Sequence, residues 1–135
     1  MTTGRRAHET SAGYPRLYLV GQRTVQTFAA GPWFFQDPQN SLILSVASVW
    51  EMQVKLQLGK LKLTLPLETL IEGQRRTNNL EILPVMLAHV LALQNLPAHH
   101  KDPFDRLLIA QANSEDASVV TNDPVFSKYT DKVLW

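Results

Sequence analysis

Three carboxylates stand where predicted helices begin or where a predicted strand ends. Glu51 lies in an otherwise apolar helical pattern, Asp105 in the first turn of another, and Asp123 just after an apolar strand-like run. If they converged they would repel one another unless a cation lay among them, and carboxylate oxygens are ligands that Mg²⁺ accepts. Such an ion activates water and neutralises charge on a phosphate, as phosphodiester hydrolysis requires. The spacing alone does not prove that the three side chains meet.

Each of these acids also has a purely structural interpretation. Glu51 and Lys55 are four residues apart and would form an ordinary ion pair on a helix surface. Asp102 is followed by a proline, which predicts that it caps the next helix, and Asp105 would complement the dipole of that helix. Asp123 also precedes a proline and is a second candidate cap. A structural role therefore remains open for every one of them.

Histidines form a competing candidate site. His99 and His100 are adjacent, with Asp102 close behind and His89 upstream. Neighbouring side chains in a loop point in different directions, and these lack the i, i+4 spacing of a helical metal site. We interpret the pair as structural or surface groups and His89 as a polar edge of the core.

The expected elements alternate between strand and helix after residue 40. Apolar, β-leaning runs predict strands at 17–20, 41–45, 80–85, 118–121 and 133–135. Helical spacing predicts helices at 47–58, 67–76, 87–94 and 103–115, with a short one after 124. Within residues 1–40, which have weak periodicity, the strand at 17–20 is the element that we predict. Strands joined by helices indicate a parallel sheet covered on both faces, with ligands beyond the carboxyl ends of the strands.

The composition fits one globular domain over residues 1–135. Hydrophobic residues make up 44% of the chain and charged residues 19%, and the net charge of +1 gives no overall attraction to nucleic acid. The absence of cysteine excludes disulfides and zinc-thiolate sites. Apolar runs fall short of the roughly 18 residues that a membrane span needs, so we expect a cytoplasmic protein without a membrane partner.

Several strings carry a resemblance to a known family. They are SVASVWEM at 45–52, LGKL at 58–61, HHKDPFDRLLIAQA at 99–112 and VTNDP at 120–124. With these strings the chain resembles the PIN domain family, also called PilT N-terminus domains, from about residue 37 to 135. The resemblance implies a three-layer α/β/α sandwich with a mostly parallel sheet. For VapC-type toxins it implies an Mg²⁺- or Mn²⁺-dependent endoribonuclease that cuts RNA, is inhibited by a cognate antitoxin and is usually a homodimer.

The resemblance also assigns the site residues. Glu51, Asp105 and Asp123 match the family's metal-binding and catalytic acids, whereas Asp102 matches none of them, as expected of a cap.

Three further residues are candidates for substrate binding. Thr121 and Asn122 match polar positions beside the acid at the strand end, and Arg106 is a candidate for contact with phosphate. A structural role is the alternative for Arg106.

The beginning of the chain departs from the family pattern. A first strand that ends in an aspartate is expected, yet the candidate strand at 17–20 is followed by Gly21, Gln22 and Arg23. Residues 1–36 are therefore an atypical segment, and a frameshifted beginning is one hypothesis for it. Loss of a central ligand would weaken metal binding, so a non-catalytic interaction module on the same fold is the alternative function.

Overall fold

The computed structural model describes residues 8–9, 15–31, 41–98, 102–121, 124–130 and 133–134. The strands are β1 (His8–Glu9), β2 (Pro15–Leu19), β3 (Ser41–Ser45), β4 (Glu81–Leu83), β5 (Ser118–Val120) and β6 (Val133–Leu134). The α-helices are α1 (Gly21–Ala30), α2 (Val46–Gln57), α3 (Leu67–Asn78), α4 (Leu87–Leu91) and α5 (Pro103–Glu115). Two 3₁₀ helices, η1 (Ala92–Asn95) and η2 (Pro124–Lys128), complete the described elements.

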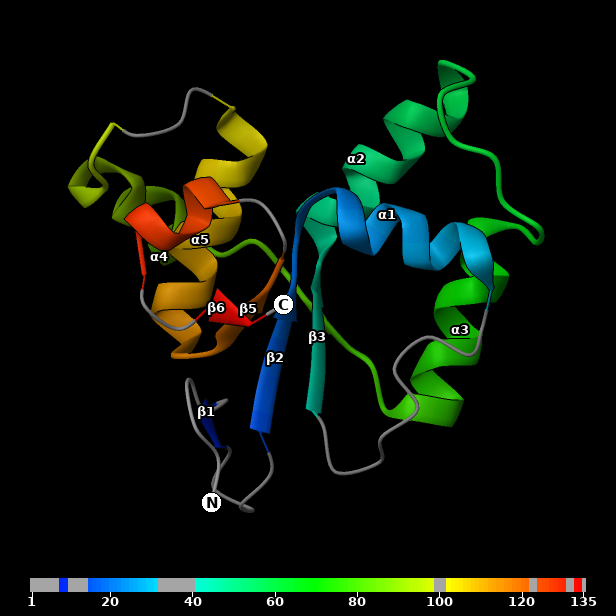
Figure 1. The fold of residues 1–135 in the computed structure, drawn as a ribbon, viewed down its shortest axis with the longest axis horizontal. Coiled ribbons are helices and arrows are strands. Elements are labelled where there is room, and N and C mark those ends of the chain that lie inside the picture. The colour runs from blue at the N-terminus through cyan, green and yellow to red at the C-terminus, as the bar shows by residue number, and fades with distance from the viewer. Residues whose placement is uncertain are drawn as a thin grey trace.

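The strands form one sheet in the order β4-β3-β2-β5-β6, and all neighbours in this order are parallel. The short β1 pairs antiparallel with the beginning of β2. The chain runs outward from β2 to β4 and then returns to β5 on the other side of β2 (Figure 1). Because the direction of progress reverses between β2 and β5, the crevice at their carboxyl ends is where a ligand site is expected.

Helices cover both faces of this sheet. Alternate residues of β2 point to opposite faces: Leu17 and Leu19 join a core with α1, α2 and α3, whereas Tyr18 and Val20 join one with α5 and η2. In Figure 1 the first group of helices lies on one side of β2 and β3, and α4 and α5 lie on the other. The predicted α/β fold, a three-layer sandwich with a mostly parallel sheet, is confirmed.

Strong local signals gave accurate boundaries after residue 40. The strand at 41–45 and the helix at 103–115 have the predicted bounds, and the other predicted elements differ by a few residues at their ends. The predicted helix at 87–94 is divided into α4 and η1. The predicted strand at 80–85 is shorter, because Pro84 has no amide hydrogen to donate to a neighbouring strand. Gly59 follows α2 with a φ of +72°, a backbone conformation that glycine adopts readily just beyond the end of a helix.

Helix α1 was not predicted. The weak periodicity of residues 1–40 gave no element for residues 21–30, but they form α1, which packs Val25 and Phe28 into the core. The helix has no side-chain cap, no acid in its first turn and no base in its last. The usual signals of a helix end are therefore absent, and tertiary packing stabilises α1 instead. Strand β1 was not predicted either.

A chain of polar side chains crosses the core between the sheet and α5. The Tyr18 hydroxyl donates to Gln111 Oε1, and Gln111 Nε2 lies 3.3 Å from His89 Nδ1. His89 Nε2 is 3.5 Å from Glu115 Oε2, and Glu115 Oε1 is 3.4 Å from Arg16 Nη2. His89 is only 3% exposed, as expected for a polar edge of the core. Burial raises the pKa of the Tyr18 hydroxyl, so this group stays a neutral donor.

Across the described ranges, no helix combines the length and the apolar character needed to cross a bilayer.

Candidate functional site

Helices α2 and α5 bring their first turns to the carboxyl edge of the sheet. Helix α2 follows β3 directly, with Ser45 Oγ accepting from the amide of Ala47 at 3.0 Å, and α5 leads back to the start of β5. The two helices meet through Trp50 and Phe104, whose ring centroids are 4.9 Å apart. Since Glu51 follows Trp50 and Asp105 follows Phe104, this contact places both carboxylates in one region.

Glu51 is a partly buried acid among other acids. Its carboxylate Oε2 lies 3.8 Å from Lys55 Nζ, which is the i, i+4 pair of the structural interpretation. Burial raises the pKa of Glu51, Lys55 lowers it in part, and the nearby charges of Asp105 and Asp102 raise it further. The ion pair therefore does not fully compensate the carboxylate, and a cation nearby would stabilise its charged form.

Asp102 has two roles, of which the sequence indicated one. Its Oδ1 accepts from the amide of Phe104 at 2.9 Å, which confirms the predicted cap at the start of α5. Its charge also raises the pKa of Glu51. We did not predict this second role, because the cap was a sufficient explanation for an aspartate at this position. Asp105, in the first turn of the same helix, is half-buried and acts on Glu51 as well.

The basic candidates already have partners. Arg106 Nη1 donates to the carbonyl oxygen of Pro97 at 3.0 Å, which holds the loop before α5 and fits the structural alternative. Lys55 is paired with Glu51. A contact of Arg106 with phosphate would have to use its other nitrogen atoms.

The acid at the end of β5 is not part of the described chain. Thr121 follows β5 and is buried at the carboxyl edge. Asn122 and Asp123 lie outside the described residues, as do the competing histidines His99 and His100. The meeting of Asp123 with Glu51 and Asp105 therefore stays a prediction.

The donor atoms at this edge suit a hard divalent ion. Glu51, Asp102 and Asp105 offer carboxylate oxygens, and their mutual repulsion is the condition that a bound cation would relieve. No three histidine, aspartate or glutamate side chains within the described ranges are close enough to hold a metal by themselves. A complete site would thus need a contribution from Asp123, from water or from a phosphate.

Ser48 is a site feature that sequence reasoning missed. It lies in the first turn of α2, three residues before Glu51, and is 4% exposed. Its Oγ has no hydrogen-bond partner among the described residues, which is uncommon for a buried hydroxyl. The sequence alone does not show that a serine within a helix will be buried with its hydroxyl unpaired among the described residues.

Comparison with known proteins now identifies the family. The sequence matches the PIN domain over residues 21–132, which is most of the chain. The chain belongs to the PIN domain family. PIN domains generally use divalent metal ions, in keeping with the carboxylates at this edge. The match begins after β2, so it includes α1 but not the strand whose end lacks the expected aspartate.

A solved structure shares the fold of this PIN domain. A chain in the crystal structure of VapBC2 from Rickettsia felis bound to a DNA fragment from their promoter superposes with a TM-score of 0.61 at 16% identity. The likeness covers 88% of this chain and 97% of the other. At 16% identity this likeness shows a common fold and nothing further. No curated protein sequence matches the chain.

Proposed function

We propose that this PIN domain, spanning residues 1–135, is a cytoplasmic Mg²⁺- or Mn²⁺-dependent endoribonuclease of a VapC-like toxin-antitoxin system. The observation that carries the proposal is the electrostatic state of Glu51: it is partly buried, and Asp105 and Asp102 raise its pKa. Acids held together in this way are a feature of functional sites. Family membership supports the reaction class, and the effect of the Asp105 charge on Glu51 supports the choice of these two residues.

The residues at the carboxyl edge of the sheet have different roles in the proposed site. Glu51, Asp105 and Asp123 would hold the ion, which supplies an activated water and neutralises charge on the scissile phosphate when bound. The contact of Trp50 with Phe104 would hold Glu51 near Asp105, so that little reorganisation would be needed when RNA binds.

The residues around these acids would bind the substrate. Thr121 and Asn122 would hydrogen-bond to the RNA backbone beside the reacting phosphate, and Arg106 would balance its charge.

A second candidate function is a non-catalytic interaction module. The observation in its favour is the end of β2, where Leu19 is followed by Val20 and Gly21 rather than by an acid. With one ligand fewer the ion would bind weakly, and the fold could be retained for its partner alone.

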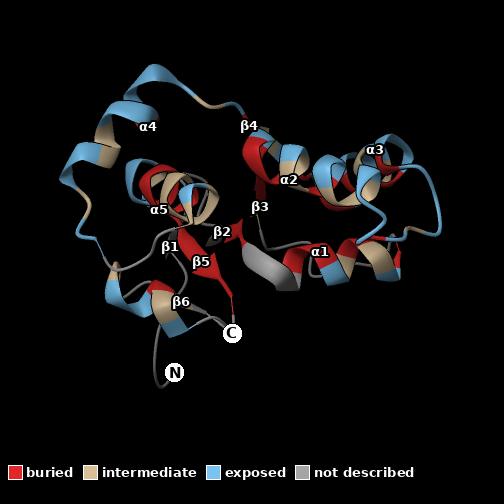
Figure 2. Ribbon diagram, turned by 90° about the horizontal axis from the view of Figure 1, so that it is seen from above, coloured by how far each residue is buried: buried red, intermediate tan, exposed pale blue. Residues whose placement is uncertain are grey.

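Protein partners are proposed from the exposed apolar residues of α4 and the turn before it. Leu87 is 73% exposed, and Met86, Val90 and Leu91 are exposed as well, so α4 is coloured mainly as exposed in Figure 2. Contiguous apolar residues on a surface mark interaction sites. A cognate antitoxin and a second copy of this chain are the partners proposed. The related complex of VapBC2 with promoter DNA supports the antitoxin.

Metal binding and RNA cleavage test the proposal together. Mn²⁺ titration calorimetry of the wild type should show millimolar or tighter binding, and a single-stranded RNA should be cut in Mn²⁺ but not in EDTA. Glu51→Gln and Asp105→Asn should each remove binding and cut the cleavage rate by about 100-fold or more. Glu81→Gln, a charge change at an exposed position at the start of β4, is the matched control and should behave as wild type.

The outcomes separate the two functions. Metal binding with cleavage, both lost in the site variants, supports the nuclease. A folded protein that neither binds Mn²⁺ nor cuts RNA contradicts it and leaves the interaction module.

A further inference from the structure

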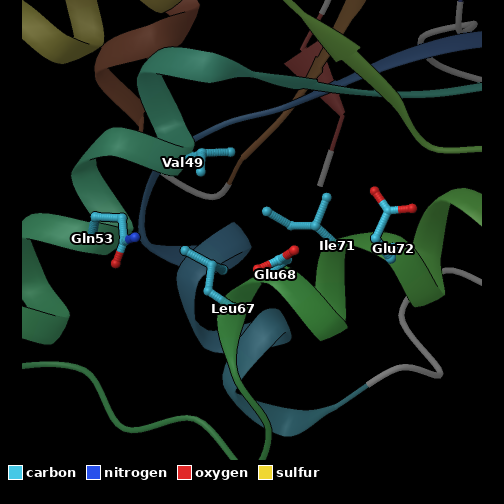
Figure 3. Close-up of a pocket in the computed structure, with 6 residues that line it drawn as sticks. All are labelled: Val49, Gln53, Leu67, Glu68, Ile71 and Glu72. Carbon is cyan, nitrogen blue, oxygen red and sulfur yellow. The ribbon is translucent and has the colours of Figure 1, made fainter.

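A small groove lies between α2 and α3, away from the carboxylates of the site. Val49 and Gln53 of α2 form one wall, and four residues at the start of α3 form the other (Figure 3). The α3 residues are Leu67, Glu68, Ile71 and Glu72. The cavity measures about 210 Å³, below the roughly 300–1,000 Å³ of pockets that bind small molecules. It is the size of an anchoring site for a side chain rather than a site for a cofactor.

The floor of the groove is apolar and continuous with the core. Leu67 is buried, and Val49 and Ile71 are half-buried against the same cluster that packs α1 and α3 on β2 and β3. An apolar side chain placed here would contact fixed core atoms, so it would gain burial without reordering the protein.

The rim of the groove is acidic. Glu68 and Glu72 are both exposed and stand four residues apart on α3, a spacing at which like charges repel. Glu72 has a weak surface ion pair with Arg75 at 3.3 Å. Glu68 has no ion pair with any of the residues that the structure describes. This rim disfavours a phosphate-bearing ligand and favours a basic one.

We infer that this groove binds a segment of a partner protein that carries an apolar anchor residue flanked by lysine or arginine. The anchor fills the floor formed by Val49, Leu67 and Ile71, and the basic side chains pair with Glu68 and Glu72. The exposed amide of Gln53, on the opposite wall, can hydrogen-bond to the main chain of that segment. The inference rests on the proposed function for its expectation of a protein partner, and it adds a contact surface separate from the exposed apolar residues of α4.

The groove shares helix α2 with the proposed metal ligand. Val49 and Gln53 each lie two residues from Glu51 on α2. A bound segment would therefore rest on the helix that carries the proposed metal ligand.

Selection from a displayed library of random 15-residue peptides, on the full chain at low salt without metal or RNA, tests the inference. The enriched peptides should carry a large apolar residue with lysine or arginine within a few positions of it. Enrichment of acidic or uncharged peptides, or of no peptide, overturns the inference. Because the selection needs no metal or RNA, it can succeed even if the proposed nuclease activity fails.

Charge variants then locate the bound peptide. The affinity of the most enriched peptide, measured by fluorescence polarisation, should fall at least tenfold for Glu68→Gln/Glu72→Gln. The matched control, Gln94→Lys/Ser127→Lys, raises the net charge by the same amount at exposed positions of η1 and η2 and should change the affinity less than twofold. Equal affinities for wild type and the glutamine variant would show that the peptide binds elsewhere and would overturn the inference.

Discussion

The indole of Trp50 packs on the ring of Phe104 with a centroid distance of 4.9 Å and an angle of 60° between the planes. Trp50 nevertheless remains 62% exposed, so the contact covers one part of the indole. It joins α2 to α5 at the residues next to Glu51 and Asp105. The aromatic pair thus positions the two acids although neither ring can bind a metal.

Removing this pair should loosen the site before it unfolds the protein. In a double-mutant cycle of Trp50→Ala and Phe104→Ala, we expect a coupling energy of about 0.5–1.5 kcal/mol in the free energy of unfolding. Urea denaturation measures it. A coupling near zero would mean that the rings do not hold the helices together.

Glu51→Gln should stabilise the protein at neutral pH while removing the proposed nuclease activity. The pKa of Glu51 is raised in the folded state, so the wild type loses stability as the pH rises above the ordinary value of 4.5. The glutamine variant has no such loss and should be more stable at pH 7 by about 1 kcal/mol. Thermal melts from pH 4 to 8 test this, and a variant that is less stable at pH 7 would contradict it.

Asp102→Ala should destabilise the protein by about 0.5–2 kcal/mol, because the amide of Phe104 loses its acceptor. Asp102→Ser keeps a capping oxygen and should recover most of that stability. Removal of the Asp102 charge should also lower the pKa of Glu51, since Asp102 is one of the charges that raise it. NMR titration of the Glu51 carboxyl carbon in both variants measures this effect, which a cap alone would not produce.

Tyr18→Phe should cost about 1–3 kcal/mol below pH 10, because Gln111 Oε1 loses its buried donor. The pKa of Tyr18 is raised, so its contribution is fully present below the ordinary value of 10.0 and declines as the pH rises above it. The stability difference between wild type and Tyr18→Phe should therefore shrink in strongly alkaline solution. Denaturant melts at pH 8 and pH 11 compare the two, and a constant difference would refute the assignment.

Gly21→Asp should strengthen metal binding at the proposed site. Gly21 begins α1 directly beyond the carboxyl end of β2, and an acid in the first turn of a helix is favourable. We expect Mn²⁺ to bind about tenfold more tightly, or about 1.4 kcal/mol, and RNA cleavage to rise with it. Gly21→Asn matches the size without the charge and should give neither gain. Equal behaviour of the two variants would show that the missing acid belongs at another position.

The sequence predicted the elements whose ends carry their own chemical signals. The start of α5 has Asp102 and a proline, so this boundary was found from its cap. The end of β3 and the start of α2 were found to within one residue from the change of apolar spacing, and the cap by Ser45 was not predicted. Helix α1 has no such residues at its ends and was missed. Its position depends on Val25 and Phe28 packing against strands that are distant in the chain.

The candidate site was predictable to the extent that family motifs carry it. Glu51 and Asp105 came from motifs, and the structure places them within reach of each other's charge. The second role of Asp102 was not predictable, and neither was the buried hydroxyl of Ser48, which has no hydrogen-bond partner among the described residues, because both depend on how α2 and α5 are oriented. The bond between Tyr18 and Gln111 joins residues 93 positions apart and has no local pattern at all.

At the carboxyl end of β2, the contacts that hold the fold are separate from the residue that would serve the proposed reaction. The strand is held by main-chain pairing with β3 and β5 and by its alternating apolar residues, none of which involves an acid beyond its last residue. A change at this strand end can therefore remove a ligand of the proposed site and leave the contacts that hold the sheet in place.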